Sequence, residues 1–123
     1  MKTTALKIEL KRLLKTINPN VYFEEAPKPL YPYIVYELSE LAYGYGKTLL
    51  DLEINAIDYG KNTTAIEDLA DTIQDTLNKY YFLNTEIQFA IYKGSKQKIE
   101  EEDKQIIRRR LTFEIHLYEM RGE

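Results

Sequence analysis

The stretch Leu50-Asp51-Leu52-Glu53-Ile54-Asn55-Ala56 alternates between apolar and polar side chains at every position. Successive side chains of a β-strand point to opposite faces of a sheet, so the stretch predicts a strand with one buried and one wet face. A second stretch, from about Ile107 to Glu119, repeats the pattern: Leu111, Phe113, Ile115 and Leu117 alternate with Thr112, Glu114, His116 and Tyr118. Both stretches predict a sheet that keeps one face in contact with solvent.

The segments around these two strands predict the rest of the sheet. β-forming residues from Tyr33 to Leu38 precede Gly44 and Gly46, which favours a hairpin with the strand that begins near Leu50. Ala26 to Pro32 holds three of the four prolines and predicts an extended connection that cannot pair regularly. We expect five strands, near residues 21–25, 33–38, 50–58, 86–92 and 107–119.

Two segments show helical periodicity. From about Thr3 to Ile17, leucines recur at helical spacing until Asn18 and Pro19 stop the helix. A second apolar stripe runs from Ile66 to Leu77, and Thr64 with Glu67 three residues later predicts a capping box at its start. The order helix, three strands, helix, two strands predicts an α+β fold. We expect a single domain, residues 1–123, with one mainly antiparallel, twisted sheet and both helices packed on one face.

The two predicted helices carry opposite charges on their outer faces. The first presents three lysines and the second three aspartates: Lys7, Lys11, Lys15, Asp68, Asp71 and Asp75. A ring of identical subunits joins one patch to a different patch on the next copy, and such complementary helices could supply the two patches. An equally good interpretation is that both are solvated helix surfaces.

Two connecting segments are candidates for partner docking. Leu41 to Lys47 is predicted as a turn, and Lys93 to Gln105 as a charged loop long enough to need a functional reason. Both are expected to become ordered when they meet a partner. The candidate contact residues are Tyr43, Tyr45, Lys47, Lys96, Lys98, Glu100, Glu101 and Glu102.

The residue types argue against catalysis, cofactors and metals. Cysteine is absent, and His116 is the only histidine, so thiolate chemistry and imidazole clusters are excluded. Gly46-Lys47-Thr48 resembles the end of a phosphate-binding loop, but that motif needs a glycine where Leu41 stands. No stretch is apolar for long enough to span a bilayer. The sequence therefore predicts an intracellular, soluble, non-enzymatic protein without a cofactor.

The layout of the chain resembles the tail-terminator or tail-completion proteins of long-tailed bacteriophages and prophages. The resemblance rests on the element order, on Tyr31-Pro32-Tyr33-Ile34-Val35-Tyr36, on the strand Leu50 to Asp58, on the helix Ile66 to Leu77 and on the arginine-led strand Arg110 to Tyr118. It implies a ring, expected to be a hexamer, at the head-proximal end of the tail tube. Such a ring stops tube growth and joins the head connector.

The resemblance also implies partners and a location. The partners would be other copies of the chain, the tail-tube protein and a head-completion or connector protein, with DNA only passing through the ring. The protein would be made in the host cytoplasm and end at the head–tail junction of the virion. Another head–tail connector or a minor tail protein remains an alternative. So does a small nucleic-acid-binding domain, although the net charge of −3 opposes it.

Overall fold

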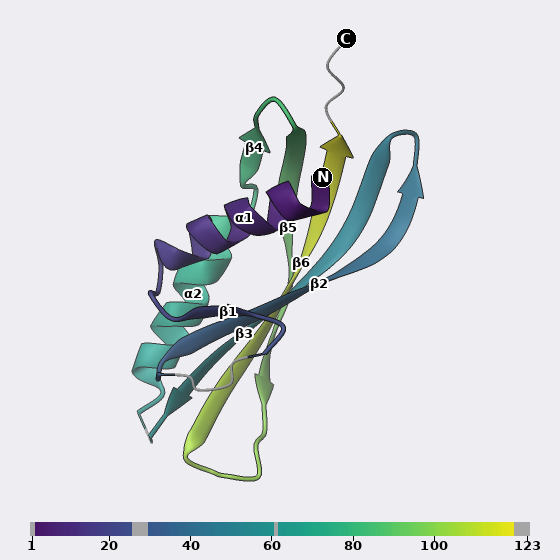
Figure 1. Cartoon of the computed structure of the whole chain (residues 1–123). Coiled ribbons are helices and arrows are strands. Elements are labelled where there is room, and N and C mark those ends of the chain that lie inside the picture. The colour runs from purple at the N-terminus through teal and green to yellow at the C-terminus, as the bar shows by residue number, and fades with distance from the viewer. Residues whose placement is uncertain (1, 26–29, 61, 120–123) are drawn as a thin grey trace.

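The computed structural model describes residues 2–25, 30–60 and 62–119. In these ranges the chain forms two helices and one six-stranded sheet with strand order β1-β2-β3-β6-β5-β4. The elements are α1 (Lys2–Lys15), β1 (Val21–Phe23), β2 (Tyr33–Gly44), β3 (Lys47–Tyr59), α2 (Thr64–Leu77), β4 (Tyr81–Leu83), β5 (Ile87–Ile99) and β6 (Ile106–Glu119). The α+β class and the two helices on one side of the sheet agree with the sequence (Figure 1).

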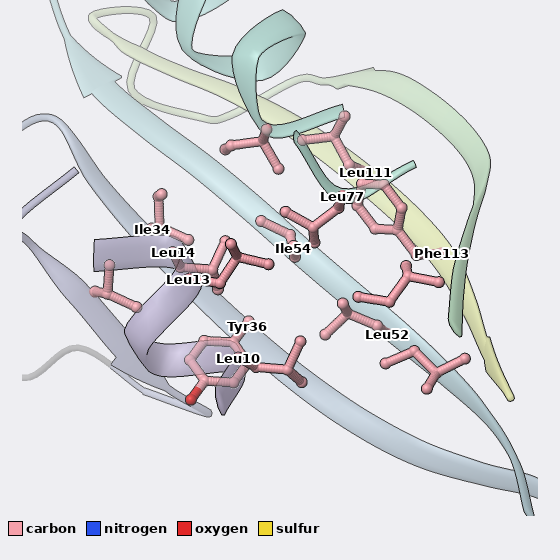
Figure 2. Packing of buried hydrophobic residues seen from close by; sticks show 14 of the residues in the cluster. Leu10, Leu13, Leu14, Ile34, Tyr36, Leu52, Ile54, Leu77, Leu111 and Phe113 are labelled. Carbon is pink, nitrogen blue, oxygen red and sulfur yellow. The ribbon is translucent and has the colours of Figure 1, made fainter. Parts of the chain in front are cut away.

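The core lies between the helices and the four long strands, β2, β3, β6 and β5. These strands pair antiparallel, and the alternation read from the sequence sets which face is buried. Leu52 and Ile54 of β3 pair with Phe113 and Leu111 of β6, and all four are at most 1 % exposed. Figure 2 shows these side chains packed together with Leu10, Leu14 and Leu77 of the helices. The period-two alternation in the sequence therefore correctly predicted both strands and the face of the sheet that the helices cover.

The two helices are held by the predicted apolar stripes. In α1 the buried stripe is Leu6, Leu10, Leu13 and Leu14, and in α2 it is Ile66, Ala70, Ile73 and Leu77. The spacing of three and four residues places each set on one side of its helix. After α1, the Asn18 side chain accepts a hydrogen bond from the Asn20 backbone at 2.8 Å, just where Pro19 prevents another helical turn.

The predicted capping box is wrong. The N-cap of α2 is Thr63, and no side chain caps the helix there, while the Thr64 backbone N–H donates to Asn62 Oδ1 at 2.9 Å. Glu67 does not reach back to the helix start, because its carboxylate binds the guanidinium of Arg109. A hydrogen bond between two charged groups is stronger than one to a neutral backbone N–H, so the arginine takes the glutamate.

The sheet differs from the expected one in its strand number and at its edges. Within the described ranges it has six strands, because the short edge strand β4 pairs with residues 88–90 of β5. At the other edge β1 pairs with β2 in parallel, so the sheet is mixed. Of the predicted connection from Ala26 to Pro32, residues 26–29 lie outside the described residues.

The predicted loop from Lys93 to Gln105 is wrong over most of its length. β5 continues to Ile99, so Lys96 and Lys98 are strand residues, and the loop contains only residues 100–105. A β-bulge between Lys93 and Lys96 lets the pairing with β6 resume after Gly94 and Ser95. Tyr43 and Lys47 also lie in strands, at the ends of β2 and β3, and only Tyr45 and Gly46 form the turn between them.

Candidate assembly surfaces

The two charged helix faces are exposed, but part of each is already engaged within the subunit. Lys11 and Lys15 are exposed, whereas the Lys7 ammonium lies 4.3 Å from the centre of the Phe23 ring. On α2, Asp68 and Asp75 are exposed, and Asp71 accepts a hydrogen bond from Lys96 Nζ at 2.7 Å. This bond raises the pKa of Lys96. A contact between the two helix faces of neighbouring copies stays a prediction.

Glu9 is a buried acid on α1 that sequence reasoning missed. It is 7 % exposed and accepts hydrogen bonds from Arg12 Nε at 2.8 Å and from the Tyr80 hydroxyl at 2.7 Å. The bond from Arg12 lowers the pKa of Glu9 against the opposing effect of burial, and Tyr80 lowers it further. The cluster fastens α1 to the segment that leads into β4, so its role is structural.

Arg109 is a buried cation that forms a second ion pair, with a partly exposed partner in the first turn of α2. Its side chain is 10 % exposed and donates to Glu67 Oε1 through Nε and to the Arg108 carbonyl at 3.1 Å through Nη1. The neighbours Arg108 and Arg110 point to the opposite face of the sheet, as expected for consecutive residues of a strand. The three arginines therefore do not form one cationic patch.

The uncovered face of the sheet carries a network of charged and amide side chains. Arg108 donates to Asn55 Oδ1 at 2.9 Å and to Glu101 at 3.1 Å, and Asn55 donates to Glu53 Oε2 at 3.1 Å. Arg110 Nε lies 3.6 Å from Glu53 Oε1, which is an ion pair without a close hydrogen bond. Of the arginines in β6, Arg110 is therefore the one that pairs with an acidic residue of β3. The network ties β3, β6 and the 100–105 loop together.

Acidic side chains crowd one part of this face. Glu37 and Glu53 lie opposite each other on β2 and β3. Partial loss of solvent around the carboxyl group, together with a hydrogen bond to Glu53 and its negative charge, raises the pKa of Glu37, although the residue as a whole is exposed. Burial and the nearby Glu53 also raise the pKa of Asp51. This crowding opposes binding of a nucleic-acid backbone to the uncovered face.

His116 is a half-buried residue of the uncovered face, as the sequence indicates. Its Nε2 lies 2.8 Å from Glu114 Oε1 and its Nδ1 lies 3.2 Å from Lys47 Nζ. In the described part of the chain, no group of three or more His, Asp or Glu side chains could hold a metal ion. Across the same ranges, none of the helices is long and apolar enough to cross a membrane.

Tyr45 is an unusual residue at the tip of the β2–β3 hairpin. The turn places Tyr45 at φ 54° and Gly46 at φ 75°, a left-handed pair of the kind that Asn-Gly or Gly-Gly normally supplies. Tyr45 is fully exposed, so no contact with the rest of the described chain explains a large aromatic ring there. A strained, exposed aromatic residue suits a contact with another molecule, which supports Tyr45 as a docking candidate.

The second predicted docking segment lies at the opposite end of the sheet. β3 and β6 pair along their whole lengths, with Lys47 opposite Tyr118 and Tyr59 opposite Ile106. The β2–β3 turn is therefore at one end, and the loop with Glu100, Glu101 and Glu102 is at the other (Figure 1). Glu100 and Glu102 are exposed, and Glu101 is partly covered by its bond to Arg108.

No family model matches the sequence, and no curated protein matches it. The fold is similar to that of a chain in a virion. A chain of the solved structure described as "Virion of native gene transfer agent (GTA) particle" superimposes with a TM-score of 0.68. The match covers 85 % of this chain and 84 % of that chain at 16 % sequence identity. At this identity the likeness establishes the shared fold, and it extends over nearly the whole of both chains.

Proposed function

We propose that the protein is a structural component of a phage-type virion that forms a ring at the head-proximal end of a tail tube. The ring ends growth of the tube and supplies the surface to which the head connector binds. The observation that carries the proposal is the fold shared with a virion chain over nearly its full length. The choice of a tail terminator among virion proteins rests on the resemblance in sequence layout, which includes the segments Tyr31 to Tyr36 and Arg110 to Tyr118.

The surfaces of the subunit fit a protein that works by contact with other chains. Large apolar side chains remain exposed on the hairpin of β2 and β3, where Leu41 is 57 % and Tyr43 is 63 % exposed. Side chains of this size at a protruding end are suited to burial in an interface. The ion pairs described above lie within the subunit, and we assign no catalytic role to their members Glu9, Glu67, Arg108, Arg109 and Arg110.

The decisive experiment removes the gene from the phage or prophage that carries it and images the particles by electron microscopy. A tail terminator is needed for length control, so the expected result is tails of abnormal and variable length that do not join heads. Tails of normal length that fail to join heads would instead favour a connector. Normal, fully joined particles would contradict any role at the head–tail junction.

A variant of Tyr45 tests the proposed docking turn in the same system. Tyr45→Asn keeps the left-handed turn and removes the aromatic ring, so it should preserve the fold and reduce the number of joined particles. Thr72→Ala is a suitable control, because Thr72 is exposed and its hydroxyl donates only to the Asp68 carbonyl in its own helix. The control should leave particle assembly unchanged.

A further inference from the structure

One border of the sheet has an uncovered stretch of strand that carries only negative charge. β1 pairs with β2 from Ile34 to Tyr36, and the Glu24 backbone N–H then donates to the Tyr36 carbonyl at 2.9 Å. In the described part of the chain, no strand pairs with the outer side of β2 beyond that point. We name this border, over residues 37–42, the acidic edge. Glu37 and Glu40 are its charged residues, and both are exposed.

The opposite border has a matching stretch that carries only positive charge. β4 and the residues before it cover β5 as far as the Ile91 carbonyl, and Asn78 Oδ1 accepts a hydrogen bond from the Lys93 backbone at 3.1 Å. Among the described residues, no strand pairs with the outer side of β5 from there to Ile99. We name this border, over residues 94–99, the basic edge, and its charged residues are Lys96 and Lys98.

We infer that the acidic edge of one copy pairs with the basic edge of the next as antiparallel β-strands, so that one sheet runs through successive subunits. This inference specifies how neighbouring copies touch in the ring proposed above. That the copies close into a ring rests on the proposed function. An unpaired strand border exposes backbone N–H and C=O groups that another strand can satisfy. The long strands already alternate in direction from β2 to β5, so antiparallel pairing continues the existing order.

The charges favour pairing of the acidic edge with the basic edge over pairing of two acidic or two basic edges. Glu40 lies on the helix-covered side of the sheet because its partner in β3 is the buried Leu50. Lys96 and Lys98 lie on the same side, because their partners in β6 are Leu111 and Arg109. In a continuous sheet, Glu40 of one copy then stands beside the two lysines of the next, whereas pairing of like edges would oppose like charges.

The registers of the sheet fit a closed ring. Within one subunit, Ser39 pairs with Asp51, Asp51 with Glu114, and Glu114 with Tyr92. Ser39 and Tyr92 therefore lie at the same height along the strands. If Glu40 stands opposite Lys96 of the next copy, that copy is shifted along the strands by four residues of β6, or about 13 Å. If Glu40 stands opposite Lys98, the shift is six residues, or about 20 Å.

The four long strands of one copy span about 19 Å across the sheet. The ratio of the shift to this width gives a tilt of the strands against the ring axis of about 35° for the first register and about 45° for the second. Both angles lie in the range found in closed barrels.

The rival interpretation is that the lysines prevent pairing, because natural proteins often place lysine on strand borders to block aggregation. Engineered cysteines separate the two interpretations, since the chain has no cysteine of its own. Ser39→Cys with Gln97→Cys tests the first register, and Ser39→Cys with Ile99→Cys tests the second. Ser39 and these partners lie at opposite borders of the same sheet, so a disulfide between them must join two copies.

The expected result, with purified full-length protein at high concentration under mild oxidation, is a ladder of dimer, trimer and larger species for one of the two pairs. Each single-cysteine variant can form at most a disulfide-linked dimer. A third pair, Lys11→Cys with Asp68→Cys, tests the contact between the helix faces in the same assay. No species larger than a dimer from either edge pair would overturn the inference.

Charge reversal supplies a second readout that does not depend on disulfides. Glu40→Lys and Lys98→Glu should each shift sedimentation toward the monomer, and the double variant should restore the larger species. Failure of the double variant to restore assembly would count against the pairing of these charges. Ladder formation together with normal tails in particles lacking the gene would leave the edge contact standing and remove the proposed function.

Discussion

Gly94 offers a sharp test of how closely β5 and β6 approach each other. A Cβ placed on Gly94 would lie 2.7 Å from Thr112 Oγ1 and 2.9 Å from the Thr112 carbonyl oxygen. The hydroxyl can rotate, but the carbonyl belongs to the backbone of the central strand. Gly94→Ala therefore has to push the two strands apart at the bulge.

The size of the effect follows from two opposing contributions. Overpacking of this kind costs about 1–3 kcal/mol. Replacing glycine by alanine in a strand otherwise gains about 0.5–1 kcal/mol, because the unfolded chain loses freedom. We expect Gly94→Ala to lower the free energy of unfolding by about 1–2 kcal/mol. For a domain of this size the melting temperature falls by about 3–4 °C for each kcal/mol.

Urea unfolding followed by circular dichroism measures this change at low protein concentration. Gly44→Ala is the matched control, because a Cβ there meets nothing within 4 Å and Gly44 has no positive φ. The control should be neutral or slightly stabilising. In a Thr112→Ala background the cost of Gly94→Ala should fall without vanishing, since the carbonyl remains. Equal stabilities of Gly94→Ala and Gly44→Ala would refute the close approach.

Four further substitutions test the Glu9 cluster, the crowded carboxylates and the turn. Tyr80→Phe removes the hydroxyl bound to Glu9 and should cost about 1 kcal/mol in urea unfolding. The pKa of Glu9 is lowered in the fold, so its stabilising contribution is present above the unfolded pKa and is lost as pH falls through the folded value. The stability of Glu9→Gln should therefore vary less between pH 7 and pH 3 than that of the wild type. The pKa of Glu37 is raised, so Glu37→Gln should increase the urea midpoint at pH 7, with a gain that shrinks on acidification. Tyr45→Asn should raise the free energy of unfolding by about 1 kcal/mol, because asparagine tolerates the left-handed turn better; an unchanged or lower midpoint would contradict the strain assigned there.

Side-chain periodicity predicted the parts of the fold in which burial has one clear direction. Leu52 and Phe113 each belong to a strand with one dry and one wet face, so sequence alternation and structure agree. The outer half of β5 gave no such signal, because Lys96, Gln97 and Lys98 are exposed and their strand is held by backbone pairing with β6. Polar residues without alternation favour a loop, and only the tertiary pairing corrects this.

The buried charges show the same limit. Glu9 stands three residues after Leu6 and four before Leu13, so helical spacing alone indicates that it faces the core side of α1. That signal was available in the sequence. Its partner Tyr80 was not, because only the fold brings two residues this far apart in the chain together. Glu67 likewise matched a local capping pattern, and the distant Arg109 decided its contact.

In a ring built by the edge pairing inferred above, the turn and the loop at opposite ends of the sheet would form two unlike rims. Every copy would contribute its Tyr45 turn to one rim and its acidic 100–105 loop to the other. One rim would then be aromatic and the other rich in carboxylates, although all the subunits are identical. A single gene product could in this way present a different chemical face to each of two neighbours stacked along the same axis.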